Sequence, residues 1–295
     1  MILITGASGF IGKHLLKAVS DKFGPENIIL LTSLPIFGFK SIDHKNYKFG
    51  KEVWLNNGVN CIHTVIHAGA FTPKNSTEGD ERSLCSSNVS NTSYLLNSLP
   101  DSVKQLIFLS SLDVYSKNND VIDESSLVSP ENLYGQSKLN CEKLLYSWAK
   151  QENKTLQILR IGHIYGPGEH SYQKLIPVTI RMLLQNKNPV IYSNGNEKRS
   201  YLHISDCVRA ICSSINLEKY QGPINVVSSK PYSIKEIVNI IIEISKKSIK
   251  PEILNKEIPV FDMVFDNKKM LKYLTQEQVD LRDGLKEEYE AFKAI

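Results

Sequence analysis

A glycine-rich turn directly after an apolar run constrains the start of this chain more than any other feature. Residues 1–5 form an apolar run, which is typical of a strand buried on both faces of a parallel sheet. A helical pattern follows, and the residues between are Gly6-Ala7-Ser8-Gly9-Phe10-Ile11-Gly12. Glycines at this spacing let the backbone approach an anion, which the helix N-terminus meets with N–H groups and its positive dipole end. The segment therefore predicts a pyrophosphate-binding turn.

Strand-like and helix-like segments alternate through the first half of the chain. Short apolar runs predict buried strands, and amphipathic segments between them predict helices. The strands are expected at 1–5, 28–31, 64–67, 106–109 and 156–161, and the helices at 12–23, 84–99 and 137–150. This alternation implies right-handed βαβ units and hence an α/β fold with a doubly wound, Rossmann-type parallel sheet.

The pattern changes after Tyr165. A Gly166-Pro167-Gly168 break comes first, strands become sparse, and helices are expected at 172–185, at 205–217 and after a Ser233–Glu236 capping box. We therefore predict an NAD(P)-binding Rossmann domain over residues 1–164 and a smaller, mixed, substrate-binding lobe over 165–295. The two are expected to interleave, because part of 200–230, with the apolar run 224–227, could return to the large sheet.

Composition excludes several classes of protein. Of the 295 residues 41% are hydrophobic and 22% charged, which fits a globular chain rather than a disordered or fibrous one. A net charge of +4 is too small for nucleic-acid binding but suits anionic small molecules. The five cysteines form no C-x-x-C pair, and no stretch approaches ~18 apolar residues. We expect a cytoplasmic protein with reduced thiols, without a secretory signal, membrane segment or bound metal.

Two further segments bear on the cofactor. Ala68-Gly69-Ala70 follows the strand at 64–67, and its small residues allow a nucleotide to lie close. The strand at 28–31 is followed by Thr32 and Ser33, where an acid would have bound the ribose hydroxyls and repelled a 2′-phosphate. Because hydroxyls tolerate that phosphate and Lys40 could neutralise it, we expect NADP(H) somewhat more than NAD(H).

A serine, a tyrosine and a lysine form the candidate catalytic group. Tyr134 and Lys138 are one helical turn apart, and Ser111 lies at the end of the strand predicted at 106–109. Hydride transfer to or from a carbinol carbon requires a proton to move on its oxygen. A free phenol has a pKa of about 10, and a nearby ammonium is expected to lower it. The Ser111 hydroxyl can hold the substrate oxygen.

These residues together resemble the extended short-chain dehydrogenase/reductases, and more narrowly the nucleotide-sugar epimerase/dehydratase/reductase family. The likeness covers nearly the whole chain. It includes the glycine turn, His67–Ala70, Ser110–Tyr115, Tyr134–Lys138, Arg160–Gly168 (like R-x-x-N-x-Y-G-P-G) and Arg199–Asp206 (like R-D-Y-x-H-V-x-D).

The resemblance assigns roles to further residues. It implies that Arg199 binds the diphosphate of a nucleotide sugar and that Asn88 and Ile161 lie beside the cofactor. It also places Thr72, Asp113 and His163 at the substrate. With the residues above, the expected cofactor site is Gly6, Ser8, Gly9, Phe10, Ile11, Gly12, Thr32, Ser33, Ala68, Gly69, Ala70, Asn88, Tyr134, Lys138 and Ile161.

Departures from the family pattern bear on the reaction. Family dehydratases carry an acid pair where this chain has Leu112-Asp113, and Leu112 cannot protonate a leaving hydroxyl, so a 4,6-dehydratase is not expected. The family asparagine of R-x-x-N is His163, and Thr72 lies where some 4-epimerases carry a lysine.

Two reactions fit these residues best. The first is reduction at C4 of a dTDP- or CDP-linked 4-keto-6-deoxyhexose, in deoxysugar, O-antigen or capsule (lipopolysaccharide-type) biosynthesis. The second is UDP-hexose 4-epimerisation with tightly held NAD. The intact triad disfavours a non-enzymatic protein, and His163 and Arg199 disfavour apolar carbonyl substrates. The resemblance also implies a homodimer formed through the helices at 84–99 and 137–150, where Leu95, Leu96, Leu144 and Leu145 serve either the interface or the core.

Overall fold

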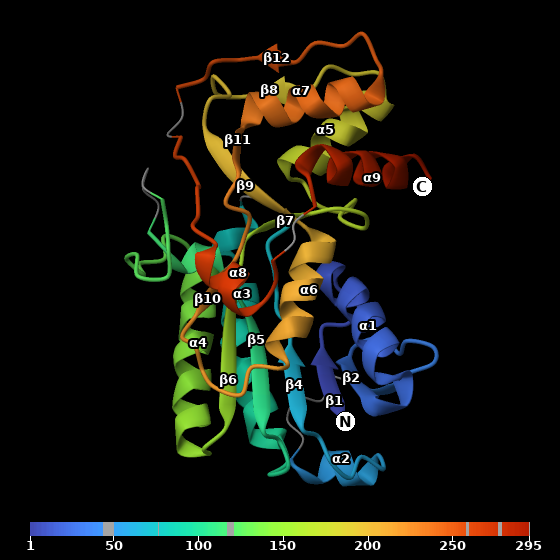
Figure 1. Ribbon diagram of the computed structural model, residues 1–295, viewed down its shortest axis with the longest axis vertical. Coiled ribbons are helices and arrows are strands. Elements are labelled where there is room, and N and C mark those ends of the chain that lie inside the picture. The colour runs from blue at the N-terminus through green and yellow to red at the C-terminus, as the bar shows by residue number, and fades with distance from the viewer. Residues whose placement is uncertain (44–49, 76, 117–120, 258–259, 277–278, 295) are drawn as a thin grey trace.

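A seven-stranded parallel sheet forms the larger part of the protein (Figure 1). The computed structural model describes residues 1–43, 50–75, 77–116, 121–257, 260–276 and 279–294. In spatial order the strands are β10 (Ile224–Val226), β6 (Thr155–Ile161), β5 (Gln105–Ser111), β4 (Thr64–His67), β1 (Ile2–Thr5), β2 (Ile28–Thr32) and β3 (Lys40–Asp43). The order reverses next to β1, as in a doubly wound fold, and the predicted fold class is confirmed.

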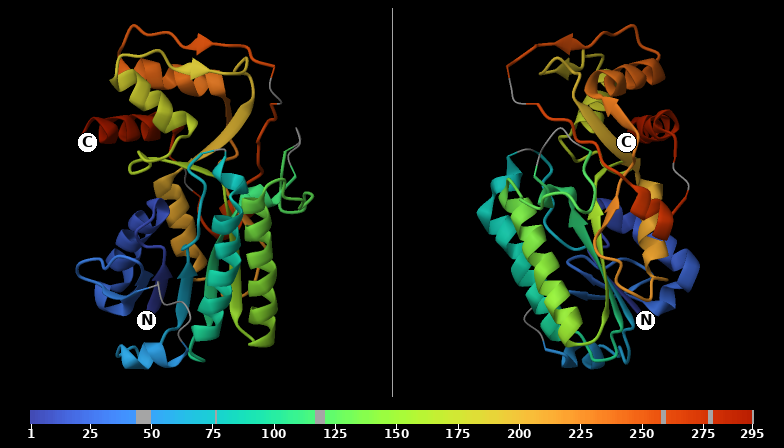
Figure 2. Two further views of the ribbon diagram at one scale, coloured as in Figure 1. Left: turned by 180° about the vertical axis from the view of Figure 1, so that it is seen from behind. Right: turned by 60° about the vertical axis from the view of Figure 1, so that its left-hand side comes forward.

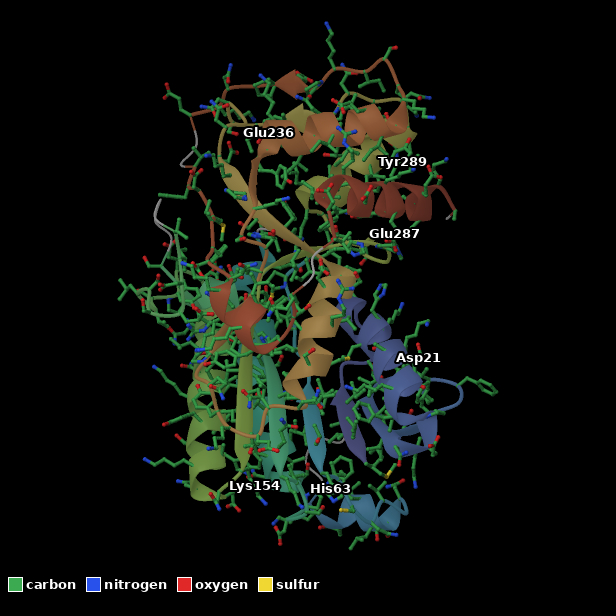
Figure 3. The ribbon with its side chains drawn as sticks, in the orientation of Figure 1. Asp21, His63, Lys154, Glu236, Glu287 and Tyr289 are labelled. Carbon is green, nitrogen blue, oxygen red and sulfur yellow. The ribbon has the colours of Figure 1, made fainter. Side chains whose placement is uncertain are left out.

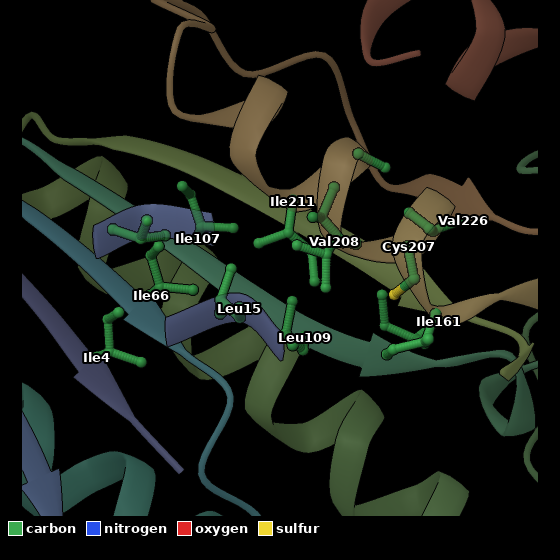
Figure 4. Close-up of a cluster of buried hydrophobic side chains, with 14 of the residues drawn as sticks. Ile4, Leu15, Ile66, Ile107, Leu109, Ile161, Cys207, Val208, Ile211 and Val226 are labelled. Carbon is green, nitrogen blue, oxygen red and sulfur yellow. The ribbon is translucent and has the colours of Figure 1, made fainter. Parts of the chain in front are cut away.

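Helices cover both faces of this sheet. On one face α1 (Phe10–Phe23) packs beside α6 (Ile204–Ser214), and Leu15, Val208 and Ile211 belong to one buried cluster with the sheet residues Ile66 and Ile107 (Figure 4). The other face carries α2 (Glu52–Asn56), α3 (Arg82–Ser98) and α4 (Leu133–Gln151). Burial on both faces explains why the inner strands are continuous apolar runs.

The four leucines considered for a dimer interface belong largely to the core. Leu95, Leu96 and Leu145 are buried in the cluster under α3 and α4, and Leu144 packs against that cluster. Their apolar pattern is therefore explained within one chain, and the homodimer stays a prediction.

Two strands, β5 and β3, differ from the expectation: β5 is longer than expected and β3 was not expected. β5 extends beyond the apolar run to Gln105 and Ser111, so the polar residues at its carboxyl end are part of the sheet. β3 was not predicted, because Lys40–Asp43 is an edge strand with one buried residue and no apolar run.

The smaller lobe lies over the carboxyl ends of the large sheet (Figure 2). It contains a mixed sheet of β7 (His163–Tyr165), β9 (Lys198–His203) and β11 (Pro231–Ser233), and a two-stranded sheet of β8 (Val190–Ile191) and β12 (Glu252–Ile253). The helices α5 (Leu175–Leu184), α7 (Ile234–Ser245) and α9 (Leu281–Lys293) share its apolar core. The predicted capping box is present at the start of α7, where Ser233 and Glu236 bond reciprocally.

The chain returns from this lobe to the large sheet. After β9 the chain enters α6 on the sheet face, and the expected strand at 224–227 is β10 at the sheet edge. The short helix α8 (Lys268–Tyr273) then contacts β10. The division of the chain at residue 164 stays a prediction.

Among the described helices, none has the length and apolar character needed to span a membrane.

A buried ion pair joins α4 to the large sheet. The Arg160 guanidinium on β6 donates from Nε and Nη2 to the Glu142 carboxylate on α4, at 3.0 and 2.8 Å, and both side chains are almost fully buried. The Ser110 hydroxyl also donates to Glu142, and Arg160 Nη1 donates to the Tyr115 hydroxyl at 2.8 Å. This network fixes α4 against the end of β5.

We expect Glu142→Leu to lower the free energy of unfolding by about 3 to 5 kcal/mol, because it leaves the Arg160 charge buried without its partner. The matched control is Glu243→Leu, which removes the acid from an exposed Glu–Arg pair with Arg282 and should cost at most about 1 kcal/mol. Urea unfolding of both variants measures the difference. Equal losses would show that the Glu142–Arg160 pair does not stabilise the fold in the way described.

Candidate active site

A large cavity lies between the sheet and the smaller lobe. Its volume is about 1050 Å³, above the usual range for a single small ligand. It runs from the glycine turn, past the ends of β2, β4 and β5, to the start of α5 and to β9. Such a position, at the carboxyl ends of the strands where the strand order reverses, is where open α/β sheets bind ligands.

Most of the predicted site residues line this cavity. Two do not, namely Asn88 and Arg199. The predicted residues in the wall are Gly6, Ser8, Gly9, Phe10, Ile11, Gly12, Thr32, Ser33, Ala68, Gly69, Ala70, Thr72, Ser111, Asp113, Tyr134, Lys138, Ile161 and His163.

The glycine turn fits a dinucleotide. Gly6 has φ +73°, and a Cβ there would lie 2.6 Å from the Gly69 backbone, so only glycine allows β1 and β4 to end this close together. The Gly9 N–H donates to the Gly6 carbonyl at 3.0 Å, and α1 begins at Phe10. The first-turn amides of a helix have no intrahelical partners and can bind a pyrophosphate. Residues 8–12 would therefore hold the phosphates of a nicotinamide dinucleotide.

The end of β2 gives no support for NADP(H). Thr32 and Ser33 line the cavity, and the Thr32 hydroxyl donates to the Leu34 carbonyl at 3.2 Å. The Lys40 ammonium donates to the carbonyl of Gly58 at 3.0 Å instead of approaching Ser33. The cation expected to neutralise a 2′-phosphate thus has another partner.

Three hydroxyl groups meet at the reaction centre. Tyr134 lies in the first turn of α4, whose N-cap Asn132 accepts from the Gly135 N–H at 2.7 Å. Hydrogen bonding with the hydroxyls of Thr72 and Ser111 acts on the Tyr134 phenol. The Ser111 hydroxyl donates to the Asp113 carboxylate at 3.2 Å. The structure therefore brings the predicted Ser111, Tyr134 and Thr72 together.

Lys138 lies one turn further along α4. Its ammonium is buried, donates to the Leu109 carbonyl at 2.8 Å and lies 5.9 Å from the centroid of the Tyr134 ring. Burial lowers the pKa of Lys138 to about 8. The hydrogen bond to Leu109 fixes the position of this ammonium at the cavity wall.

The pKa of Tyr134 in the cofactor-free protein differs in direction from the expectation that Lys138 lowers it. Burial, together with the Asp113 carboxylate, raises the pKa of Tyr134 well above its usual value, and the hydroxyls of Thr72 and Ser111 offset only part of that rise. The ammonium of Lys138 was expected to lower this pKa. It does not prevail, because it is directed at the Leu109 carbonyl while Asp113 repels a phenolate.

The substrate side of the cavity is lined by residues of β7, β9 and α5. Among the described residues, His163 Nδ1 is buried without a hydrogen-bond partner, and the ring lies 5.6 Å from that of Tyr201. Burial, with the charges of Lys174 and Arg199, lowers the pKa of His163 to about 3. A neutral imidazole therefore faces the cavity where the family pattern has an asparagine.

Asn88 holds the wall of the cavity rather than forming it. Its side-chain oxygen accepts from the Phe71 N–H at 2.7 Å, and its nitrogen donates to the Phe71 carbonyl at 3.3 Å and to the Ser137 hydroxyl at 3.0 Å. Asn88 thus supports the loop before Thr72, and its contact with the cofactor stays a prediction. Its neighbour on α3 that does line the cavity is Asn91.

Arg199 lies beside the cavity and is directed away from it. Nη1 donates to the carbonyls of Lys198 at 2.8 Å and of Phe261 at 2.6 Å. Tyr201, two residues later and on the same face of β9, lines the cavity instead. The Arg199 guanidinium is held by these two carbonyls instead, so its contact with a diphosphate stays a prediction.

Sequence reasoning missed most of the substrate side. Glu169, Tyr172, Lys174 and Tyr201 all line the cavity. Tyr201 could have been found from its period-two relation to Arg199 in the R-D-Y-like segment. Lys174 gave one weak signal, a position at the start of a predicted helix.

Comparison with known proteins agrees with this geometry. The model of the NAD dependent epimerase/dehydratase family matches residues 2–226. A dTDP-D-glucose 4,6-dehydratase of Dictyostelium discoideum is 32% identical over 71% of this chain, and the match spans 54% of that protein. A dTDP-4-dehydro-6-deoxyglucose reductase of Escherichia coli is 28% identical over 84% of this chain and 83% of the relative.

Solved structures show the same fold over the whole chain. UDP-glucuronic acid 4-epimerase from Bacillus cereus, solved with UDP-glucuronic acid and NAD, superposes with a TM-score of 0.84 at 25% identity and covers 99% of both chains. UDP-glucose 4-epimerase from Thermotoga maritima gives a TM-score of 0.87 at 20% identity, over 99% of this chain and 98% of that chain. The chain belongs to the NAD dependent epimerase/dehydratase family, whose members modify nucleotide sugars.

We expect the Tyr134 phenol to stay protonated to high pH in the cofactor-free protein, because burial and Asp113 disfavour the phenolate. The measurement is tyrosinate absorbance against pH, taken as the difference between wild type and Tyr134→Phe. No step should appear below pH ~10. A step at lower pH would show that Lys138 outweighs burial and Asp113.

Proposed function

We propose that the protein is an NAD(H)-dependent reductase of a nucleotide-linked 4-keto-6-deoxyhexose, acting at C4 in deoxysugar biosynthesis. The observation that carries the proposal is the placement of the Tyr134 phenol beside the Ser111 hydroxyl in the cavity wall, with the apolar Leu112 next to Ser111. A carbonyl that receives hydride needs a proton on its oxygen, and the Tyr134 phenol is the proton donor of the cavity wall beside Ser111.

Ser111, Tyr134 and Lys138 each have a separate role in the proposed reduction. The Ser111 hydroxyl holds the C4 oxygen and stabilises negative charge on it. Tyr134 gives its proton to that oxygen, and the buried Lys138 ammonium stabilises the phenolate that remains. The nicotinamide, when bound, supplies the hydride to C4. Solvent then returns a proton to Tyr134.

Leu112 supports reduction over dehydration. It follows Ser111, lines the cavity and is 5% exposed, and it carries no proton for a leaving hydroxyl. Elimination of water from a hexose needs an acid and a base at this place. The similarity to the E. coli reductase, over most of both chains, supports the same reaction class.

We propose NAD(H) rather than NADP(H) as the cofactor. The glycine turn fits either dinucleotide, but the Lys40 ammonium, the cation expected at Ser33, donates to the Gly58 carbonyl. The B. cereus and other structures of similar fold were solved with NAD.

A nucleotide-sugar 4-epimerase is the second candidate. Reduction and oxidation at C4 use the same Ser111, Tyr134 and Lys138, and the matched 4-epimerases cover nearly the whole chain. An epimerase needs Tyr134 as a base in its first half-reaction, and the raised pKa of the phenol in the cofactor-free protein opposes that step.

The cofactor released from the purified, denatured protein separates the two candidates. A reductase should bind NADH reversibly and consume it when given a dTDP- or CDP-linked 4-keto-6-deoxyhexose, as followed by loss of NADH absorbance. About one NAD retained per chain, with conversion of UDP-glucose to UDP-galactose and no net NADH use, would overturn the reductase in favour of the epimerase. Preference for NADPH over NADH in the same assay would overturn the proposed cofactor.

We expect Tyr134→Phe to lower turnover by a factor on the order of 10² or more while leaving NADH affinity nearly unchanged, because it removes only the general acid. Tyr146→Phe, on an exposed part of the same helix, is the control and should keep wild-type turnover. Steady-state kinetics and NADH binding by fluorescence measure the two effects. Near-normal turnover in Tyr134→Phe would remove this tyrosine from the mechanism.

A further inference from the structure

Two buried glutamates lie behind the substrate side of the cavity. Glu169 follows the Gly166–Gly168 turn, is 2% exposed and forms part of the cavity wall. Glu288 lies on α9 and is 0% exposed; Figure 3 labels its neighbours Glu287 and Tyr289. The chain thus brings its last helix against the loop that follows β7, and the two carboxyls face each other.

The two carboxyls cannot both be ionised in this setting. Both oxygens of Glu288 are buried without a hydrogen-bond partner of standard geometry in the described ranges. Burial raises the pKa of Glu288 well above its usual range, and the neighbouring Glu169 adds to the rise. Burial raises the pKa of Glu169 to about 7, although Glu288 and the cation of Lys174 act against this. Glu169 therefore loses its proton first, near neutral pH, while Glu288 keeps its proton.

A lysine of the cavity wall, Lys174, is close enough to Glu169 for the charge of the carboxylate to act on it. Lys174 is the N-cap residue of α5, and its ammonium lies 4.8 Å from the centroid of the Tyr172 ring. Over the part of the chain that the structure describes, it forms no ion pair. The carboxyls that act on its charge are Glu169 and Asp113. Ionisation of Glu169 therefore changes how much positive charge Lys174 offers to a ligand.

We propose that Glu169 and Glu288 share a proton and thereby control how strongly Lys174 binds the anionic part of the substrate. This inference rests on the proposed function, since it takes the anion to be the diphosphate of a nucleotide sugar. When Glu169 is protonated, the ammonium is available to the phosphates. When Glu169 is ionised, it competes with them. Glu169 is thus a specificity residue, and Glu288 is a positioning residue that can donate its retained proton to the ionised Glu169.

The other charged and titratable groups around Glu169 do not supply the same response. The pKa values of Tyr172 and Tyr201 are raised by burial, so both stay neutral. The Arg181 guanidinium on α5 donates to the carbonyls of His170 and Tyr172. His14 Nε2 lies 2.8 Å from the Pro167 carbonyl oxygen, and the variant His14→Gln tests its contribution.

The test is calorimetric binding of UDP-glucose and dTDP-glucose, whose diphosphates keep constant charge between about pH 6 and about pH 8.5. For the wild type we expect affinity to fall by about tenfold as pH rises through about 7, because Glu169 ionises and competes for Lys174. Glu169→Gln should bind with the low-pH affinity throughout and show no pH dependence.

Glu288 is tested by two substitutions. Glu288→Leu removes the proton donor, so the pKa of Glu169 rises further and the midpoint of the binding profile moves to higher pH. Glu288→Gln keeps a donor and should restore nearly the wild-type profile. Glu290→Gln, an exposed acid on the same helix, and His14→Gln are controls that should leave the profile unchanged.

The outcomes separate this inference from the proposed function. Binding that is independent of pH in the wild type, or a profile in Glu169→Gln equal to wild type, overturns the role of the pair and leaves the nucleotide-sugar function intact. Failure of the wild type to bind either nucleotide sugar at any pH overturns both. Thermal unfolding checks that each variant is folded; if Glu288→Leu does not fold, the Glu169→Gln profile decides.

Discussion

The buried pair of Glu142 and Arg160 is the interaction on which the geometry of the candidate site depends. Catalysis by a serine on a strand and a tyrosine on a helix requires the two elements to keep a fixed distance. Here the Arg160 guanidinium on β6 and the Ser110 hydroxyl on β5 both donate to the Glu142 carboxylate on α4. Taking these charges out of water costs free energy. The hydrogen bonds of the network offset that cost only when helix and sheet have one defined arrangement. Ser111 and Tyr134 are positioned by that arrangement.

The smaller lobe completes the site through burial and charge rather than through further catalytic groups. It supplies His163, Lys174 and Tyr201 to the wall, and its last helix places Glu288 behind them. Each of these groups is enclosed by protein, so the charge of one changes the protonation of the next. The substrate side therefore responds as a unit, which is what a site for an anionic ligand of defined shape requires.

The sequence was sufficient where local pattern decides the structure. The apolar runs of β1, β2 and β4 predict strands buried on both faces, and the glycines at 6–12 predict the turn between β1 and α1. It was insufficient where distant segments decide. β3 has no apolar run because it is an edge strand, the direction of Arg199 depends on the carbonyl of Phe261, and nothing near Glu169 in the sequence indicates a second buried acid on α9.

The sequence alone is also insufficient to predict which reaction the site catalyses. Ser111, Tyr134 and Lys138 are readable from spacing, but they do not distinguish an acid from a base, since reduction and oxidation at C4 pass through the same groups. The pKa of Tyr134 adds a property that spacing does not reveal, because three-dimensional burial and the Asp113 carboxylate raise it. A site that keeps its phenol protonated favours giving a proton to a nascent alkoxide. Because a catalyst accelerates both directions of a reaction, the sugar and the cofactor that bind decide whether this phenol acts as an acid or as a base.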